Sequence, residues 1–221
     1  MSGRFLDRRD AGRQLAQRVA ALELEQPIVY ALPRGGVPVA AEIAAAIGAP
    51  LDLVLVRKIG APMQPELAVG AVVDGEAPEL VINHDIARDT GASQEYIDRV
   101  CARELAEIER RRRLYLADRP RADPKGRTAV VVDDGIATGA TAIAALHALK
   151  KRGARRLVVA VPVAPTDTVE RLQREADDVI CLLQPLDFWG ISAFYVDFHQ
   201  LEDDEVTRAL EAAAARAGGR A

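Results

Sequence analysis

Short apolar runs alternate along the chain with segments of helical periodicity. The runs are rich in valine and leucine and have the length of buried strands; they lie at 27–32, 51–58, 128–132, 156–163 and 179–182. Segments with apolar residues every three or four positions lie beside these runs, at 7–22, at 37–47, from the end of the valine run to about 152, and from 166 onward. Strands that alternate with helices predict an α/β fold, with a mostly parallel, twisted sheet flanked by helices.

The alternation is interrupted in the middle of the chain. Residues 67–73 and 79–82 are shorter strand candidates on either side of a turn at Asp74-Gly75, and 93–115 has the apolar spacing of one long helix. We therefore expect one domain with a core and a helical insertion that caps the sheet: 1–221 overall, with the core at about 27–82 and 128–201 and the insertion at about 83–127.

The stretch 130–141 has the most specific chemistry. It reads Val-Val-Val-Asp-Asp-Gly-Ile-Ala-Thr-Gly-Ala-Thr, which predicts a buried strand, an acidic pair, a small hydroxyl-bearing turn and a helix start. Asp133 and Asp134 then lie at the carboxyl end of a strand, where open α/β sheets bind ligands. Backbone N–H groups at a helix start form an anion site, here over Ala137, Thr138, Gly139, Ala140 and Thr141. The pattern suits a phosphorylated sugar; an ordinary turn whose acids cap a helix is the alternative.

Two widespread phosphate loops do not match this stretch. A Walker loop requires a lysine after its second glycine, where Ala140 stands, and G-x-G-x-x-G does not occur in the chain. The stretch resembles the ribose-phosphate signature of type I phosphoribosyltransferases. In that family the acidic pair holds the 2′- and 3′-hydroxyls of 5-phosphoribosyl-1-pyrophosphate (PRPP), and the loop holds its 5′-phosphate. The resemblance implies the fold of that family, with Asp133 and Asp134 on the ribose and 137–141 on the phosphate.

A second loop of similar character follows the strand at 27–32. Pro33-Arg34-Gly35-Gly36 combines a guanidinium, which suits phosphate oxygens, with glycines that let backbone N–H groups approach a ligand. Type I phosphoribosyltransferases bind pyrophosphate with such a loop, often through a non-proline cis peptide. The resemblance thus implies pyrophosphate binding by Arg34, Gly35 and Gly36, and a cis bond between Pro33 and Arg34.

Arg57 and Lys58 end the apolar run at 51–58. The family commonly places basic residues there, before a mobile loop that closes over PRPP. The resemblance implies that both assist in binding pyrophosphate and that 59–66 is the mobile loop; solvated charges at a strand end are the alternative. The chain is also similar to a bacterial group of the family that shares the Pro-Arg-Gly-Gly and Arg-Lys-Ile-Gly segments.

Aromatic residues make up only 4% of the chain, yet they gather between 188 and 198. In the purine-salvage branch of the family a ring in this region stacks on the base, and an acid after it helps organise the magnesium ion. The resemblance implies base contacts for Phe188 or Trp189, and a metal role for Asp197 beside Asp133 and Asp134. Aromatic packing between the sheet edge and the C-terminal helix is the alternative.

Composition and charge bear on the class of partner. The 221 residues are 49% hydrophobic and carry a formal net charge of −4, without the basic excess of nucleic-acid binding proteins. The apolar runs are shorter than a membrane span, and the first residues are polar rather than signal-like. Cys101 and Cys181 lie far apart, as expected of reduced cysteines. We expect a cytoplasmic protein without nucleic-acid or membrane partners; a homo-oligomer is possible.

Taken together, the resemblance implies a transferase of nucleotide metabolism. A nitrogenous, base-like acceptor would displace pyrophosphate from C1 of PRPP with the help of Mg²⁺, and Arg34, Asp133 and Asp134 would be the catalytic residues. Two alternatives remain: a regulator that binds PRPP or a nucleotide without chemistry, and a phosphoribosyl hydrolase. The residues do not identify the acceptor.

Overall fold

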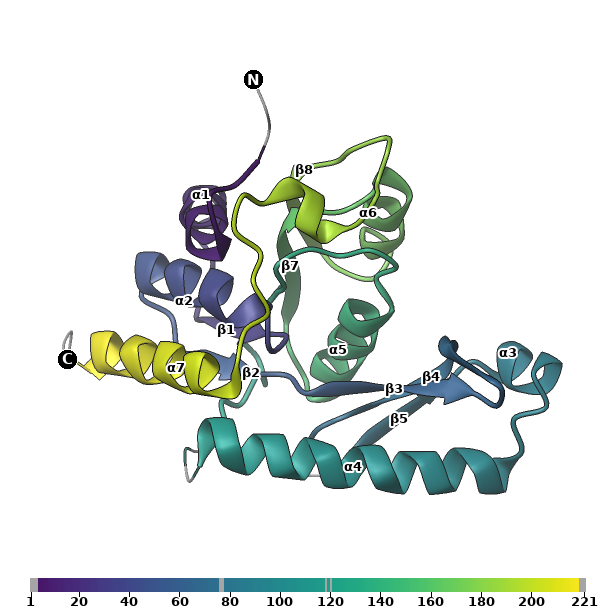
Figure 1. Cartoon of the computed structure of the whole chain (residues 1–221). Coiled ribbons are helices and arrows are strands. Elements are labelled where there is room, and N and C mark those ends of the chain that lie inside the picture. The colour runs from purple at the N-terminus through teal and green to yellow at the C-terminus, as the bar shows by residue number, and fades with distance from the viewer. Residues whose placement is uncertain (1–3, 76–77, 118, 120, 219–221) are drawn as a thin grey trace.

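The body of the protein is a parallel five-stranded sheet with helices on both faces (Figure 1). The computed structural model describes residues 4–75, 78–117, 119 and 121–218. The strand order is β2-β1-β6-β7-β8, and all neighbouring pairs are parallel. The fold predicted from the sequence is therefore confirmed. The strands are β1 (Pro27–Ala31), β2 (Leu51–Leu53), β6 (Thr128–Val132), β7 (Arg156–Val163) and β8 (Asp178–Leu183).

Successive strand residues point to opposite faces and enter two separate cores. Val130 and Val132 pack with the helices α1 (Arg8–Ala20), α2 (Gly36–Ile47) and α7 (Asp203–Gly218). Ala129 and Val131 pack on the other face with α5 (Ala140–Lys151) and α6 (Thr166–Leu172). The continuous valine run is explained by this burial on both sides, since neither face of the strand meets solvent.

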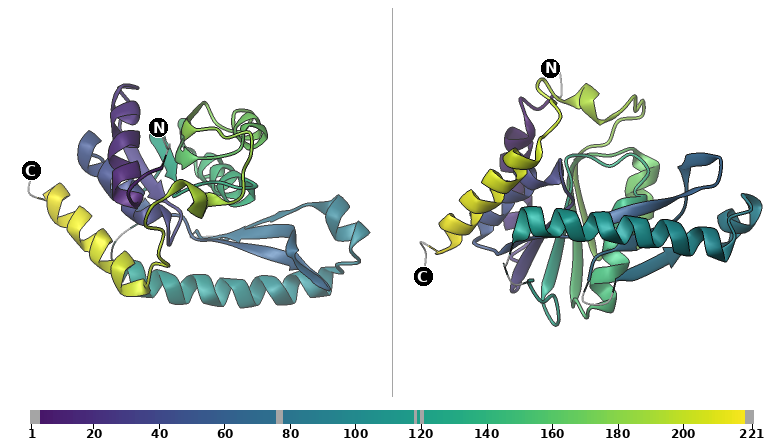
Figure 2. Two further views of the ribbon diagram at one scale, coloured as in Figure 1. Left: turned by 45° about the horizontal axis from the view of Figure 1, so that its top comes forward. Right: turned by 60° about the horizontal axis from the view of Figure 1, so that its bottom comes forward.

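A second unit, which we call the arm, comprises residues 56–116 and projects from the body (Figures 1 and 2). It is an antiparallel sheet covered by helices, built from β3 (Val56–Ala61), β4 (Gln64–Val73), β5 (Glu79–Ile82), α3 (His84–Asp89) and α4 (Gln94–Leu116). Its sheet and helices share a small core of their own that includes Ile59, Val69 and Ile97. The long helix at 93–115 was predicted, with Ser93 now its N-cap.

Two sequence predictions in this region are wrong. The apolar run 51–58 is two strands, because Leu55 leaves the main sheet and its N–H donates to the Asp74 carboxylate at 3.0 Å. The segment 59–66 is not an open loop but the β3–β4 hairpin. Gly60 and Pro65 meet so closely there that a Cβ on Gly60 would lie 2.4 Å from the Pro65 carbonyl oxygen. The arm thus contains three strands and the short helix α3 in addition to the long helix that was predicted.

The loops that follow β1 and β6 meet at the carboxyl edge of the main sheet. The Leu32 N–H donates to the Val132 carbonyl at 2.9 Å, which extends the strand pairing into the loops. The Pro33–Arg34 peptide is cis, as predicted. After β8 the chain passes through the 3₁₀ turn η1 (Ile191–Phe194) and returns across this edge toward α7.

None of the helices in the described residues combines the length and apolar character needed to cross a membrane.

Candidate active site

The loop between β6 and α5 encloses a cavity of about 200 Å³. Gly139 adopts φ 78° and turns the chain into α5, so the first N–H groups of that helix open onto the cavity. Thr138 and Thr141 are exposed there. Backbone N–H groups and hydroxyls at a helix start form an anion site. The lining residues are Asp133, Gly135, Ile136, Ala137, Thr138, Gly139, Ala140, Thr141 and Ala142.

Contacts from β7 and α6 hold this loop in place. The Ile136 N–H donates to the Val163 carbonyl at 2.9 Å, and the Thr168 hydroxyl donates to the Ala137 carbonyl at 2.7 Å. Arg171 in turn donates to the Thr168 hydroxyl at 2.9 Å. The loop is therefore supported through both its backbone and its neighbours, which preorganises the N–H groups for a ligand.

The two acids of the motif have different surroundings. Asp133 lines the cavity, whereas Asp134 is 7% exposed and lies behind it. The Asp134 carboxylate is 2.7 Å from Nε of Arg8, and its backbone carbonyl accepts a 2.6 Å hydrogen bond from the Tyr195 hydroxyl. Burial, and then the charge of Asp134, raise the pKa of Asp133 well above its usual value. Burial also raises the pKa of Asp134, although the ion pair with Arg8 opposes the shift.

The loop after β1 packs directly against this acidic pair. A Cβ on Gly35 would lie 2.0 Å from Oδ2 of Asp134, and one on Gly36 would lie 2.5 Å from the Val132 carbonyl oxygen. Only glycine permits so close an approach of the two loops. Arg34 extends beside them, with its guanidinium 3.8 Å from the Asp203 carboxylate at the start of α7. The structure thus brings together both loops that the sequence singled out.

Arg57 and Lys58 lie on the arm rather than in these loops. Nε of Arg57 is 2.7 Å from the carboxylate of Glu104 on α4, whose side chain is 7% exposed. Lys58 is exposed on the same strand, β3. Arg57 is thus paired through Nε with an acid of the arm itself.

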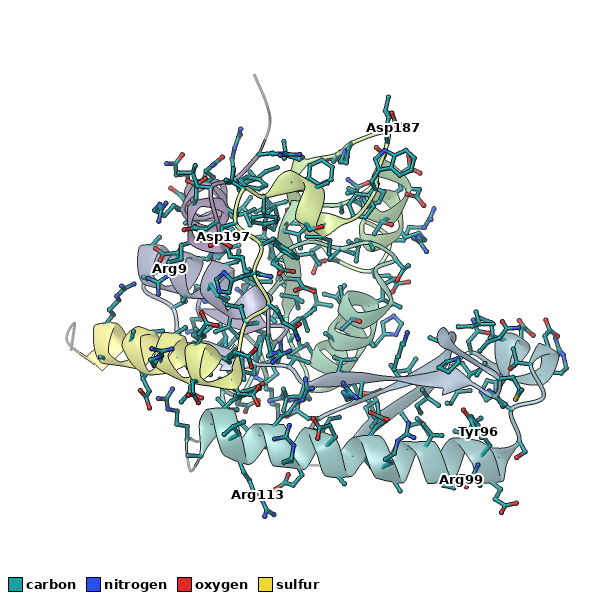
Figure 3. All side chains as sticks on the ribbon, in the orientation of Figure 1. Arg9, Tyr96, Arg99, Arg113, Asp187 and Asp197 are labelled. Atoms are coloured by element: carbon teal, nitrogen blue, oxygen red, sulfur yellow. The ribbon has the colours of Figure 1, made fainter. Side chains whose placement is uncertain are left out.

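The aromatic segment forms a small cluster with an exposed turn. Phe188 stacks on Phe194 with ring centroids 5.9 Å apart, while Trp189 is 90% exposed. The turn itself, marked by Asp187 in Figure 3, lies at the outer end of the segment. Beyond the turn, Ile191 packs against Gly135 of the β6–α5 loop, where a Cβ on Gly135 would lie 2.5 Å from the Ile191 side chain. Phe188 therefore packs within the protein, and Trp189 presents a free ring.

The carboxylates do not form a metal cage. Asp197, labelled in Figure 3, is 3.0 Å from Nδ1 of His199 and is exposed. Within the part of the chain that the structure describes, no group of three or more His, Cys, Asp or Glu side chains is placed to hold a metal ion. Mg²⁺ is often bound by one or two carboxylates together with substrate phosphates. Asp133, on the cavity wall, fits that mode of binding.

Sequence reasoning missed two side chains at this edge, Arg8 and Asp203. Arg8 belongs to α1 and is 8% exposed, whereas its neighbour Arg9 is exposed. The helical pattern of 7–22 contains several arginines and offers no local signal that separates the buried one. Asp203 contacts Arg34 and also accepts a hydrogen bond from the Tyr115 hydroxyl of α4.

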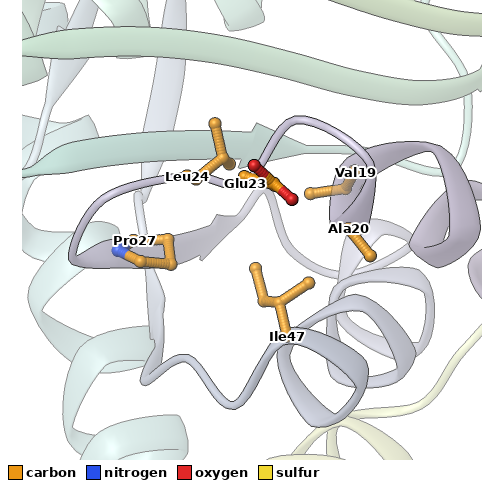
Figure 4. A pocket seen from close by; sticks show the side chains of 6 residues that line it. All are labelled: Val19, Ala20, Glu23, Leu24, Pro27 and Ile47. Carbon is orange, nitrogen blue, oxygen red and sulfur yellow. The ribbon is translucent and has the colours of Figure 1, made fainter.

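A second cavity, of about 220 Å³, lies at the opposite end of β1 (Figure 4). Apolar side chains and a single acid line it: Val19, Ala20, Glu23, Leu24, Pro27 and Ile47. It offers no basic group or helix start for a phosphate. This cavity therefore does not suit a phosphosugar.

Comparison with known proteins shows the family of the chain. Residues 5–199 match the family model described as "Phosphoribosyl transferase domain". A Mycobacterium tuberculosis protein named provisionally as a phosphoribosyl transferase is 48% identical over 209 residues, which cover 95% of this chain and 47% of that protein. The chain thus spans about half the length of this curated relative. It belongs to the phosphoribosyltransferase family.

Two further relatives show how far the likeness extends. The crystal structure of the protein TT1426 from Thermus thermophilus superposes with a TM-score of 0.82 at 48% identity, covering 94% of this chain and 97% of that one. A uracil phosphoribosyltransferase from Lysinibacillus sphaericus is 38% identical over 73 residues, 33% of this chain and 34% of that enzyme. The first likeness covers nearly the whole fold, and the second is confined to a part.

Proposed function

We propose that this chain transfers the phosphoribosyl group of PRPP to a nitrogenous acceptor and releases pyrophosphate. The observation that carries the proposal is the junction of the two loops. A helix-start cavity with Asp133 on its wall adjoins the Gly35-Gly36 backbone, which packs on the same acidic pair. Along PRPP the 5′-phosphate is followed by the ribose and then by the pyrophosphate. The helix-start cavity, Asp133 and the Gly35-Gly36 backbone follow one another in the same order. Membership of the phosphoribosyltransferase family supports the assignment.

Each part of the donor has a matching group in the site. The N–H groups and hydroxyls of 137–141 bind the 5′-phosphate, because they are fixed, exposed donors at a positive helix end. Asp133 accepts hydrogen bonds from the ribose hydroxyls at the cavity wall. Arg34 and the backbone N–H groups of Gly35 and Gly36 receive the pyrophosphate, for which the guanidinium must exchange its 3.8 Å contact with Asp203 for phosphate oxygens.

The protein contributes mainly positioning and electrostatics. As the bond from C1 to the pyrophosphate oxygen lengthens, positive charge develops on the ribose ring and negative charge on the leaving group. The Asp133 carboxylate stabilises the first, and Arg34 with the Gly35 and Gly36 N–H groups stabilises the second. Mg²⁺ carried by the substrate would neutralise pyrophosphate charge, and Asp133 on the cavity wall would be the carboxylate that helps to hold it.

The acceptor would enter from the side of the aromatic segment. Trp189 offers an exposed ring on which a planar base can stack, while the Phe188 ring already stacks on Phe194. Arg57 and Lys58 follow one another on β3, and Arg57 would exchange its 2.7 Å contact with Glu104 for pyrophosphate oxygens. We keep both as candidate pyrophosphate ligands of a closed state, and Asp197 as a candidate metal ligand of that state.

The experiment is pyrophosphate release from PRPP and Mg²⁺, measured with purines, pyrimidines and small amines in turn and once without an acceptor. Release that depends on one acceptor class supports the transferase. Release without any acceptor indicates a phosphoribosyl hydrolase instead. Tight PRPP binding without release for any acceptor indicates a regulator, and absence of PRPP binding contradicts the assignment of the site.

A further inference from the structure

Arg8, the first residue of α1, is buried at the acidic pair and lies outside the two ligand-binding loops. Its Nε is 2.7 Å from Oδ2 of Asp134, and the two side chains are 9% and 10% exposed. One terminal nitrogen donates to the His199 carbonyl at 2.9 Å, and the guanidinium lies over the Phe198 ring, 3.9 Å from its centroid. Nε, one terminal nitrogen and one face of this cation are therefore engaged inside the protein, and the side chain is only 9% exposed.

The start of α1 fixes Arg8 in this place. Asp7 is the N-cap, and its carboxylate accepts the Asp10 N–H at 2.7 Å. The chain before it is tied to the returning C-terminal segment, because the Phe5 N–H donates to the Phe194 carbonyl at 2.9 Å. The helix start and the segment around 194–199 thus form one scaffold for the guanidinium.

The ion pair determines where each acid points. Oδ2 of Asp134 faces Arg8 and the Gly35 backbone, and Asp134 is not among the residues that line the cavity beside Asp133. One carboxyl oxygen of Asp133 accepts the Asp134 N–H at 2.9 Å. The backbone that carries Asp133 is therefore anchored by the neighbour that Arg8 holds. Two adjacent carboxylates repel, and Arg8 compensates one of the two charges.

Resting on the proposed function, we propose that Arg8 is a positioning residue of the ribose site. It binds Asp134 as a structural carboxylate and so leaves Asp133 as the acid that faces the sugar hydroxyls. The two acids of the motif then have different roles: Asp133 contacts substrate, and Asp134 with Arg8 fixes its position. Breaking a buried ion pair by removing one partner leaves an uncompensated charge, so loss of Arg8 disturbs this geometry strongly.

The test compares binding of inorganic phosphate and of ribose 5-phosphate to the full chain by calorimetry. The variants are Arg8→Gln and Arg8→Lys, with Arg9→Gln as the control that removes one charge from the same helix turn at an exposed position. We expect Arg8→Gln to weaken ribose 5-phosphate binding by about tenfold or more, the equivalent of one lost hydrogen bond to a charged group, and to leave phosphate binding unchanged. Arg8→Lys keeps the charge, so its affinity for ribose 5-phosphate should lie between those of wild type and Arg8→Gln. Arg9→Gln should bind both ligands as wild type does.

A double variant separates positioning from general stability. In an Asp133→Asn background, Arg8→Gln should cause little further loss of ribose 5-phosphate affinity, because both changes act on the same contact. The inference is overturned if Arg8→Gln weakens the binding of phosphate and of ribose 5-phosphate equally, or weakens the binding of neither. If Arg8→Gln does not fold, Arg8→Lys decides between the same outcomes. A wild-type chain that binds ribose 5-phosphate no better than phosphate contradicts the proposed function itself.

Discussion

Gly35 and Asp134 belong to different loops, yet a Cβ on Gly35 would lie 2.0 Å from Oδ2 of Asp134. This contact joins the loop expected to bind pyrophosphate to the acidic pair expected to bind ribose. The three nearest atoms all belong to the Asp134 carboxyl group, and Gly35 has an ordinary φ of −58°, so a Cβ there meets a steric obstacle rather than backbone strain. Because Gly35 has no side chain, the loop expected to bind pyrophosphate can lie directly against the acidic pair expected to bind ribose.

Gly35→Ala tests this packing. We expect the free energy of unfolding to fall by about 1–3 kcal/mol, the usual cost of inserting a methyl group into a filled site. The measurement is urea unfolding of Gly35→Ala, of Asp134→Ala and of the double variant. The three atoms nearest to the new Cβ belong to the Asp134 carboxyl group, so Gly35→Ala should cost little further stability in the Asp134→Ala background. Strictly additive losses would contradict the contact.

Asp133→Asn should stabilise the protein at neutral pH. The pKa of Asp133 is raised by burial and by the charge of Asp134, so ionisation of Asp133 disfavours the folded state. Above the raised pKa the wild type bears this cost and the amide does not; below the unfolded pKa both side chains are neutral and the difference disappears. We expect a gain on the order of 1 kcal/mol, or about 2–4 °C in Tm, at pH 7–8. Melting curves between pH 3 and pH 8 provide the check, and a gain that grows toward acid pH would be inconsistent with it.

Gly139→Ala should weaken phosphate binding and the fold together. Gly139 has φ 78°, a conformation that costs other residues about 1–2 kcal/mol, and it directs the first N–H groups of α5 into the cavity. Gly126→Ala is the control, because Gly126 has φ 71° with no atoms near its missing Cβ. Both variants should lose similar stability in denaturant unfolding, but only Gly139→Ala should lose phosphate affinity in calorimetry. Equal phosphate affinity in the two variants would exclude a role for this turn in the anion site.

Trp189→Ala should affect the acceptor and not the fold. The ring is 90% exposed, so its removal leaves no cavity. If a planar acceptor stacks on it, KM for that acceptor should rise by about tenfold, because stacking of a base on an aromatic side chain contributes about 1–3 kcal/mol. Leu186→Ala, at a 95% exposed position in the same turn, is the control. A change in KM for PRPP, or equal effects of both substitutions, would assign the ring another role.

The main sheet and the two loops were predictable because the residues that define each strand and loop are adjacent in the sequence. A run such as Val130–Val132 identifies a strand buried on both faces, and parallel topology then brings its carboxyl end to that of β1. Gly35, Gly36, Asp133 and 137–141 follow those strands directly in sequence. The cis peptide at Pro33–Arg34 followed from the family resemblance and is present.

The arm and the Arg8 contact were not predictable in the same way. The apolar run 51–58 gives no sign of the break at Leu55, whose N–H bonds to Asp74, the residue after β4. Arg8 meets Asp134 across 126 positions of sequence, and nothing in its own helix distinguishes it from Arg9. Contacts of this kind arise only after the sheet has placed the segments side by side.

The most direct test of the central claim is pyrophosphate release from PRPP and Mg²⁺ by wild type and by Asp133→Asn in parallel. The account predicts acceptor-dependent release by the wild type. It predicts that Asp133→Asn reduces kcat/KM for PRPP by at least about a hundredfold, the scale of one lost transition-state contact, while the melting temperature does not fall. Undiminished release by Asp133→Asn would contradict the account, because the acid on the cavity wall would then have no part in the reaction.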